Sequence, residues 1–195
     1  MFLVPVFKIG IANAWIFMSV FLLQMLAIFF INKRVRERSH ISYKLRRTRL
    51  ERYASIMGNI TWFLALAYSV FLPLQTGTVW FYTGLFVFII GLLLLTIATY
   101  NFIATPVDQL ITKGAYSISR HPMYLATFLI CLGAGFAAGS LLFIFLTIIM
   151  SICFFQEAVI EERYCLDRYG ITYQEYQNNI SRWIGIPGRH CRKKR

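Results

Sequence analysis

The chain has no charged side chain over a long central stretch. Asp, Glu, Lys and Arg are all absent between Tyr53 and Val107, and hydrophobic residues make up 58% of the 195 residues. A membrane-spanning helix needs about 20 apolar residues, so this stretch is long enough for two crossings. A soluble domain of this length would not have so much apolar sequence. The composition therefore predicts a polytopic membrane protein.

Signals for a cleaved leader and for metal or disulfide chemistry are also missing. The segment 9–31 has no basic N-terminal flank or small-residue cleavage site and is too long for a signal-peptide core, so we expect it to be a retained first span. None of the four cysteines is spaced as in a metal site or a disulfide framework. We therefore predict no metal and assign the cysteines no chemical role.

The hydrophobic runs predict an all-α fold that forms a single membrane domain over residues 1–195. Five transmembrane helices are expected, at about residues 9–31, 53–74, 78–102, 122–139 and 141–158. A basic loop at 33–52 and a charged C-terminal lobe at 159–195 lie outside these spans. The short turn at Gly139-Ser140 makes the fourth and fifth spans an antiparallel pair, and the small residues from Gly133 to Gly139 are expected to let helices pack closely.

The positive charge is concentrated on one side of this predicted topology. The formal net charge is +12, and nine Lys and Arg residues lie between Lys33 and Arg52. The positive-inside rule then places the N-terminus outside and the C-terminal lobe in the cytoplasm, which explains the charge without a nucleic-acid partner. We interpret the 33–52 loop mainly as an orientation signal and an anchor for anionic lipid headgroups, with direct substrate contact as the alternative.

A polar cluster, Arg120-His121-Pro122-Met123-Tyr124, precedes the fourth span. Pro122 is typical of the first turn of a helix, so a helix is expected to begin there. The free N–H groups and the dipole of this helix start, together with Arg120, predict an anion site. His121 and Tyr124 are three residues apart and share a helix face. Ionisable groups at membrane depth are usually functional or tightly paired, which makes this cluster the first candidate site.

Three acids lie at the expected end of the fifth span: Glu157, Glu161 and Glu162. Because the fourth and fifth spans form a hairpin, the acids should emerge beside His121. An anion site facing an acidic site suits a mixed-charge ligand, with a carboxylate at one end and an ammonium or a ribose diol at the other. The alternative is a solvated helix end in which the acids pair with Arg163 and Arg168.

Tyr169, Tyr173 and Tyr176 follow at helical spacing. They predict an amphipathic interfacial helix with an aromatic belt, a lid over the polar cluster, or both.

Taken together, these motifs resemble a known family. Gly114-x-Tyr116-x-x-x-Arg120-His121-Pro122-x-Tyr124, then Glu161-Glu162, then Tyr169-Gly170-x-x-Tyr173-x-x-Tyr176 are similar to the isoprenylcysteine carboxyl methyltransferases. They also resemble the wider group of integral-membrane methyltransferases that includes the phospholipid N-methyltransferases. The resemblance covers residues 78–187, and the chain is most similar to small prokaryotic members, which implies a prokaryotic cell membrane.

The resemblance implies S-adenosylmethionine as cofactor, with S-adenosylhomocysteine as product, bound on the cytoplasmic side by the last two spans and the C-terminal lobe. A soluble-type G-x-G-x-x-G fingerprint is absent, as expected for this family. The residues that match the cofactor pocket are Tyr116, Arg120, His121, Pro122, Tyr124, Glu161 and Glu162.

The expected methyl acceptor is a lipophilic or lipidated molecule that enters from the bilayer, with a carboxylate favoured. We predict that Arg182 or Arg163 orients it. Asn179 stands where the eukaryotic prenylcysteine enzymes have a basic residue, which weakens the case for a prenylcysteine substrate. Alternatives are a phospholipid-type N-methyltransferase, an NADPH-dependent membrane reductase and a non-enzymatic membrane scaffold. The sequence predicts no protein partner.

Overall fold

The computed structural model describes residues 9–32 and 47–185, and the regular structure in these residues is helical. An isolated bridge between Asn13 and Pro73 is the exception within the described ranges. The elements are α1 (Trp15–Ile31), α3 (Arg49–Ser69), α4 (Val79–Ala104), the short 3₁₀ turn η1 (Gly114–Ser117), α5 (Pro122–Ala137), α6 (Leu141–Tyr169) and α7 (Ile171–Asn179). The predicted all-α class is confirmed for these residues.

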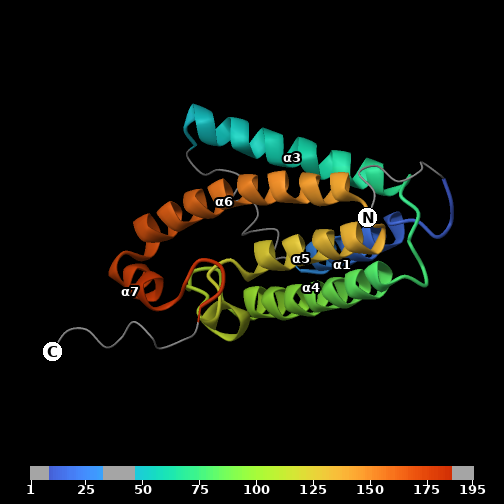
Figure 1. Ribbon diagram of the computed structural model, residues 1–195. Helices are drawn as coiled ribbons and strands as arrows, with labels where there is room; N and C mark the ends of the chain where they lie inside the picture. Colours follow the sequence, from blue (N-terminus) through green and yellow to red (C-terminus); the bar gives the residue numbers. More distant parts are fainter. Residues whose placement is uncertain (1–8, 33–46, 186–195) are drawn as a thin grey trace.

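The long helices form an elongated bundle (Figure 1). α4 lies along α5, α3 lies along α6, and α5 and α6 form the expected antiparallel hairpin. α1 packs against α5 and α3, and α7 folds back against the end of α6. The end of α4, the start of α5 and the end of α6 therefore meet at one end of the bundle, together with η1 and α7.

Polar side chains determine where the long helices begin. Thr48 and Glu51 form a capping box at the start of α3. Thr78 accepts a hydrogen bond from the backbone N–H of Phe81 in α4, and Ser140 accepts one from Phe143 in α6. Pro122 occupies the first turn of α5, as predicted.

Several helix boundaries differ from those of the predicted spans: α1 begins at Trp15 rather than at residue 9, and α3 and α6 differ as well. The capping box starts α3 at Arg49 rather than at residue 53, and the helix ends at Ser69 rather than at 74. α6 does not end at residue 158 but continues to Tyr169, where Gly170 adopts a φ of 54° and begins the turn into α7. The acids Glu157, Glu161 and Glu162 therefore lie within a helix, not at its end.

Two helices, Val79–Ala104 and Leu141–Tyr169, are long and apolar enough to cross a membrane by length and composition. α1 and α5 are shorter apolar helices. Large apolar side chains stand exposed on the outer faces of the bundle, among them Phe86 and Leu93 of α4 and Ile152 of α6. Five crossings remain a prediction, and most of the basic 33–52 loop lies outside the described residues.

Glycine brings the backbones of α4 and α5 into contact. A Cβ added to Gly84 would lie 2.3 Å from the backbone N of Ala137, and one added to Gly133 would lie 2.6 Å from that of Phe88. This contact confirms that small residues in the 133–139 stretch serve helix packing. Gly84, which is their partner on α4, was not predicted from the sequence.

We expect Gly84→Leu to destabilise the protein, because the side chain would push α4 away from α5. Overpacking costs about 1–3 kcal/mol, so the thermal midpoint in detergent should fall by about 5 °C or more. Thr83→Leu is the matched control, since Thr83 is exposed on the same helix. Equal shifts in both variants would contradict the packing argument.

Candidate active site

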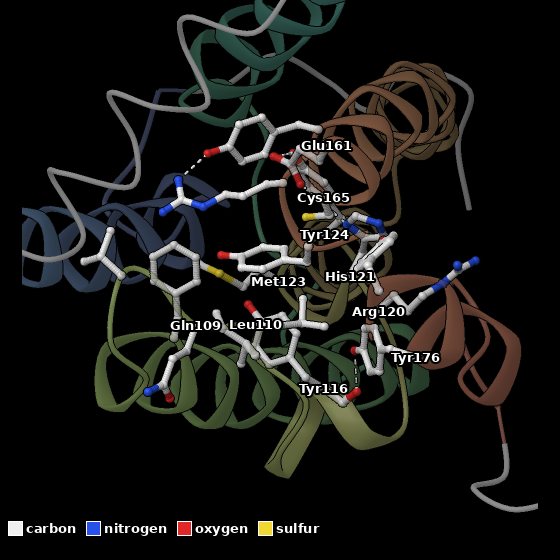
Figure 2. A pocket seen from close by; sticks show the side chains of 17 residues that line it. Gln109, Leu110, Tyr116, Arg120, His121, Met123, Tyr124, Glu161, Cys165 and Tyr176 are labelled. Carbon is white, nitrogen blue, oxygen red and sulfur yellow. Dashed lines mark hydrogen bonds and ion pairs between the residues drawn. The ribbon is translucent and has the colours of Figure 1, made fainter. Parts of the chain in front are cut away.

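A cavity of about 410 Å³ lies at the end of the bundle where α4 ends and α5 begins (Figure 2). Part of its wall is polar and includes Arg120, His121, Tyr124 and Glu161. Another part is apolar and comes from the end of α4, the loop that follows it and the first turn of α5: Phe102, Val107, Leu110, Ile111 and Met123. The cavity is therefore amphipathic.

Next to the cavity, the carboxylate of Glu162 is buried among cations. Its side chain is 4% exposed. Arg182 donates to it twice, from Nε to Oε1 at 2.9 Å and from Nη2 to Oε2 at 2.7 Å. Arg120 Nη2 and His121 Nε2 lie 3.4 Å and 3.2 Å from the same Oε1, and Gln177 Nε2 donates to Oε2 at 3.4 Å. A buried carboxylate is tolerated only with such partners.

His121 bridges the two adjacent glutamates. Its Nδ1 lies 3.5 Å from Glu161 Oε2, and its Nε2 lies 3.2 Å from Glu162 Oε1. Burial by itself lowers the pKa of His121, but the hydrogen bonds and charges of the two carboxylates outweigh it and raise the pKa above its ordinary value. Only the imidazolium form can donate to both carboxylates at once.

Glu161 is the carboxylate that faces the cavity. Its side chain is 32% exposed, and it accepts a hydrogen bond of 2.8 Å from the Tyr124 hydroxyl. Glu162 is not part of the cavity lining. The two neighbouring acids therefore have different surroundings: Glu161 can reach a ligand, whereas Glu162 anchors the wall behind it.

The segment after α7 completes this wall through backbone hydrogen bonds. The N–H of Arg120 donates to the carbonyl of Ser181 at 3.1 Å, and that of His121 donates to the carbonyl of Arg182 at 3.3 Å. The N–H of Gly185 donates to the carbonyl of Ile118 at 3.0 Å. Residues 181–185 thus run beside residues 118–121, which brings Arg182 to Glu162.

The motifs Gly114-x-Tyr116 and Tyr173-x-x-Tyr176 meet in another part of the cavity wall. Gly114 has a φ of +62° and lies against the Asn101 side chain, which accepts a 3.0 Å hydrogen bond from the Ala115 N–H. This turn places Tyr116 in the wall, where its carbonyl accepts a hydrogen bond of 2.6 Å from Tyr176 (Figure 2).

The C-terminal tyrosines are not on one helix face, because Gly170 separates Tyr169 from Tyr173 and Tyr176. Tyr173 and Tyr176 are buried, and all three tyrosines line the cavity. This arrangement fits the lid interpretation and not an outward-facing aromatic belt.

Five of the nine predicted site residues line the cavity: Tyr116, Arg120, His121, Tyr124 and Glu161. Pro122 is fully buried as the first residue of α5, and Glu162 and Arg182 form the ion network beside the cavity. Arg163 lies apart, where its Nη2 donates to Glu51 of α3. The functional roles of these residues stay predictions.

Glu157 does not belong to this cluster. It accepts hydrogen bonds from Arg47, just before α3, at 2.9 Å and from the hydroxyl of Ser55 in the second turn of α3. In the described part of the chain, neither Arg163 nor Arg168 forms an ion pair with the three acids of α6. The interpretation of these acids as a solvated helix end is therefore wrong.

Three cavity residues of α6 were missed by the sequence analysis: Tyr164, Cys165 and Arg168. Cys165 and Arg168 follow Glu161 by four and seven residues, so they share its helix face. That spacing was a usable signal, but the expected end of the helix at residue 158 concealed it.

The phospholipid methyltransferase family model matches residues 76–172, about half of the chain. These residues are similar to the members of this family. The match runs from the turn before α4 to the beginning of α7, so it includes η1, the start of α5 and both glutamates of the site. Arg182 and the segment around it lie beyond the matched residues.

A protein whose name also denotes a methyltransferase is similar to part of the chain. Protein-S-isoprenylcysteine O-methyltransferase of Saccharomyces cerevisiae is 33% identical over 79 residues, which is 40% of this chain and 32% of the relative. The chain thus matches about a third of that protein's length. Both names indicate a methyltransferase, and the resemblance drawn from the motifs is confirmed.

The raised pKa of His121 predicts a pH-dependent stability. The charged imidazole stabilises the folded state below its ordinary pKa of about 6.5, and this contribution is lost as the pH rises through the higher folded value. The thermal midpoint in detergent should therefore fall over this window in the unaltered protein. His121→Gln should flatten that dependence, and an unchanged pH profile in this variant would contradict the role of His121.

Proposed function

We propose that the protein is an integral-membrane methyltransferase that uses S-adenosylmethionine to methylate a lipophilic acceptor. The observation that carries the proposal is the partly exposed carboxylate of Glu161, which lines the same cavity as Arg120 and His121. The match of residues 76–172 to the phospholipid methyltransferase family supports the reaction class. The apolar wall supports an acceptor with a hydrocarbon part.

The donor set fits the cofactor. Arg120 is nine-tenths buried, and its Nε and Nη1 are buried without a hydrogen-bond partner. Together with the first turn of α5, these N–H groups suit a carboxylate, whereas Glu161 suits an ammonium or a ribose diol. A volume of about 410 Å³ lies within the range of small-molecule sites.

In this mechanism the protein acts mainly by binding and orientation. The cofactor, when bound, supplies an electrophilic methyl group on a sulfonium. His121 holds Glu161 in place from one side and Tyr124 holds it from the other, so the ligand-binding carboxylate is preorganised. The tyrosines of α7 close the site against water. A carboxylate acceptor needs no general base, whereas an amine must first lose a proton.

The acceptor in this proposal is a carboxylate on a lipid-like molecule that enters from the bilayer. The name of the yeast relative supports this class, whereas the family's name makes a phospholipid amine the alternative. Arg182 or Arg163 is proposed to orient the acceptor. Arg182 belongs to the ion network beside the cavity, whereas Arg163 pairs with Glu51 of α3. Arg182 also donates two hydrogen bonds to Glu162, so replacing Arg182 would also disturb the ion network beside the cavity.

The proposed orientation has five crossings, with the cavity on the cytoplasmic side. In support, the cavity lies at the end of the bundle from which α3 begins, where the described part of the basic segment, residues 47–52, also lies. Anionic headgroups would meet this segment, in a cell membrane that the resemblance suggests is prokaryotic. The opposite end has the uncharged turns before α4 and before α6.

Calorimetric titration of the detergent-purified protein with S-adenosylhomocysteine, and separately with NADPH, tests the cofactor. We expect micromolar binding of S-adenosylhomocysteine that weakens about tenfold or more in Glu161→Gln, because a charge-assisted hydrogen bond is lost. Binding of NADPH alone would favour a reductase. Binding of neither ligand would favour a scaffold.

Arg182→Ala tests the acceptor-orienting role. If Arg182 orients an anionic acceptor, the acceptor KM should rise about tenfold with cofactor affinity unchanged. Titration with S-adenosylhomocysteine separates this outcome from an effect through Glu162. A tenfold loss of cofactor affinity would show that Arg182 acts on the cofactor side of the site instead.

A further inference from the structure

Of the four arginines in or near the candidate site and the end of α6, three are already paired with carboxylates. Arg120 and Arg182 pair with Glu162, and Arg163 pairs with Glu51. Arg168 differs, because it lines the cavity and no carboxylate of the described residues forms an ion pair with it. It is also exposed, so it lies at the rim where a ligand enters.

Two tyrosines hold the guanidinium of Arg168 in place. Its Nη1 donates to the Tyr164 hydroxyl at 2.5 Å, and its central carbon lies 5.9 Å and 5.6 Å from the ring centres of Tyr164 and Tyr169. Both tyrosines also line the cavity. Because these contacts hold the planar guanidinium in one orientation, less entropy is lost when it binds an oxyanion. Its remaining N–H groups are suited to donate to such an oxyanion.

Distance along α6 separates Arg168 from the proposed cofactor site. Arg168 follows Glu161 by seven residues, which corresponds to about 10 Å of helix. An anion held by Arg168 therefore lies toward the opposite end of the cavity from the Glu161 carboxylate. The apolar wall formed by Phe102, Val107 and Leu110 belongs to the same cavity and offers a surface for a hydrocarbon chain.

We propose that Arg168 is the specificity residue at the mouth of the cavity, where it binds the carboxylate or phosphate oxygens of an amphiphilic acceptor. That this amphiphile is the methyl acceptor rests on the proposed function. The binding of an anionic amphiphile by Arg168 rests on the geometry of the cavity alone. Arg168 selects the headgroup, and the apolar wall accommodates the chain.

Asp108 opposes such a ligand. It lies in the loop after α4 and attracts Arg168 electrostatically without forming an ion pair among the described residues. A bound oxyanion would be repelled by this carboxylate. Asp108→Asn should therefore strengthen the binding of anionic amphiphiles, which is the opposite of the effect expected at Arg168.

Direct binding in a neutral detergent tests the proposal with three probes: N-acetyl-S-farnesylcysteine, its uncharged methyl ester, and dodecyl phosphate. The acid should bind the unaltered protein about tenfold more tightly than the ester. Arg168→Gln should abolish this preference, Arg168→Lys should retain part of it, and Asp108→Asn should increase it. Arg52→Gln, which removes an exposed arginine of α3, is the matched control and should leave the preference unchanged.

The probes also separate the possible sources of the anion. A stronger Arg168-dependent affinity for dodecyl phosphate indicates a phospholipid-like headgroup, and a stronger one for the farnesylcysteine acid indicates a carboxylate acceptor; both outcomes support the proposal. An unchanged acid preference in Arg168→Gln would overturn it. So would a loss of S-adenosylhomocysteine affinity in that variant, because Arg168 would then belong to the cofactor site.

The same experiment distinguishes this proposal from the proposed function. If the protein does not bind S-adenosylhomocysteine but keeps an Arg168-dependent preference for the acid, the methyltransferase proposal fails and the anion site stands. If it binds S-adenosylhomocysteine without any acid preference, the cofactor site stands and the role of Arg168 is wrong.

Discussion

The neutralisation of one buried carboxylate, that of Glu162, is the interaction on which the rest of the site depends. A charge removed from water costs several kcal/mol unless cations and hydrogen bonds surround it. Here the partners come from the start of α5, from α7 and from the segment that follows α7. The network therefore determines how three separate parts of the chain meet around the cavity.

The pair Glu161-Glu162 shows how one helix can divide two tasks between neighbouring residues. Successive residues of an α-helix are rotated by about 100°, so only one of the two can face the cavity. Glu162 turns inward and stabilises the wall, whereas Glu161 remains partly exposed between His121 and Tyr124. His121 contacts both, so the charge state of a single imidazole influences the wall and the ligand-binding carboxylate together.

Local sequence signals were sufficient for much of the fold. Pro122 marked the start of α5, the Gly139-Ser140 turn marked the hairpin, and the polar motif marked the cavity. The predictions failed where the partner of a side chain is distant in sequence. Glu157 and Arg163 both pair with the beginning of α3, and no periodicity within α6 could reveal that. The position of Arg168 in the cavity wall was not predicted, because the hydropathy of the sequence falls before α6 ends.

The backbone pairing between residues 181–185 and residues 118–121 has a consequence for biosynthesis. A ribosome makes α4, α5 and α6 well before it makes Ser181 and Arg182, so these helices can pack while the cavity still lacks one wall. Until Arg182 arrives, Glu162 lacks its bidentate partner. Ligand binding is thus a late event, and a nascent chain that stops short of this segment cannot form the complete site.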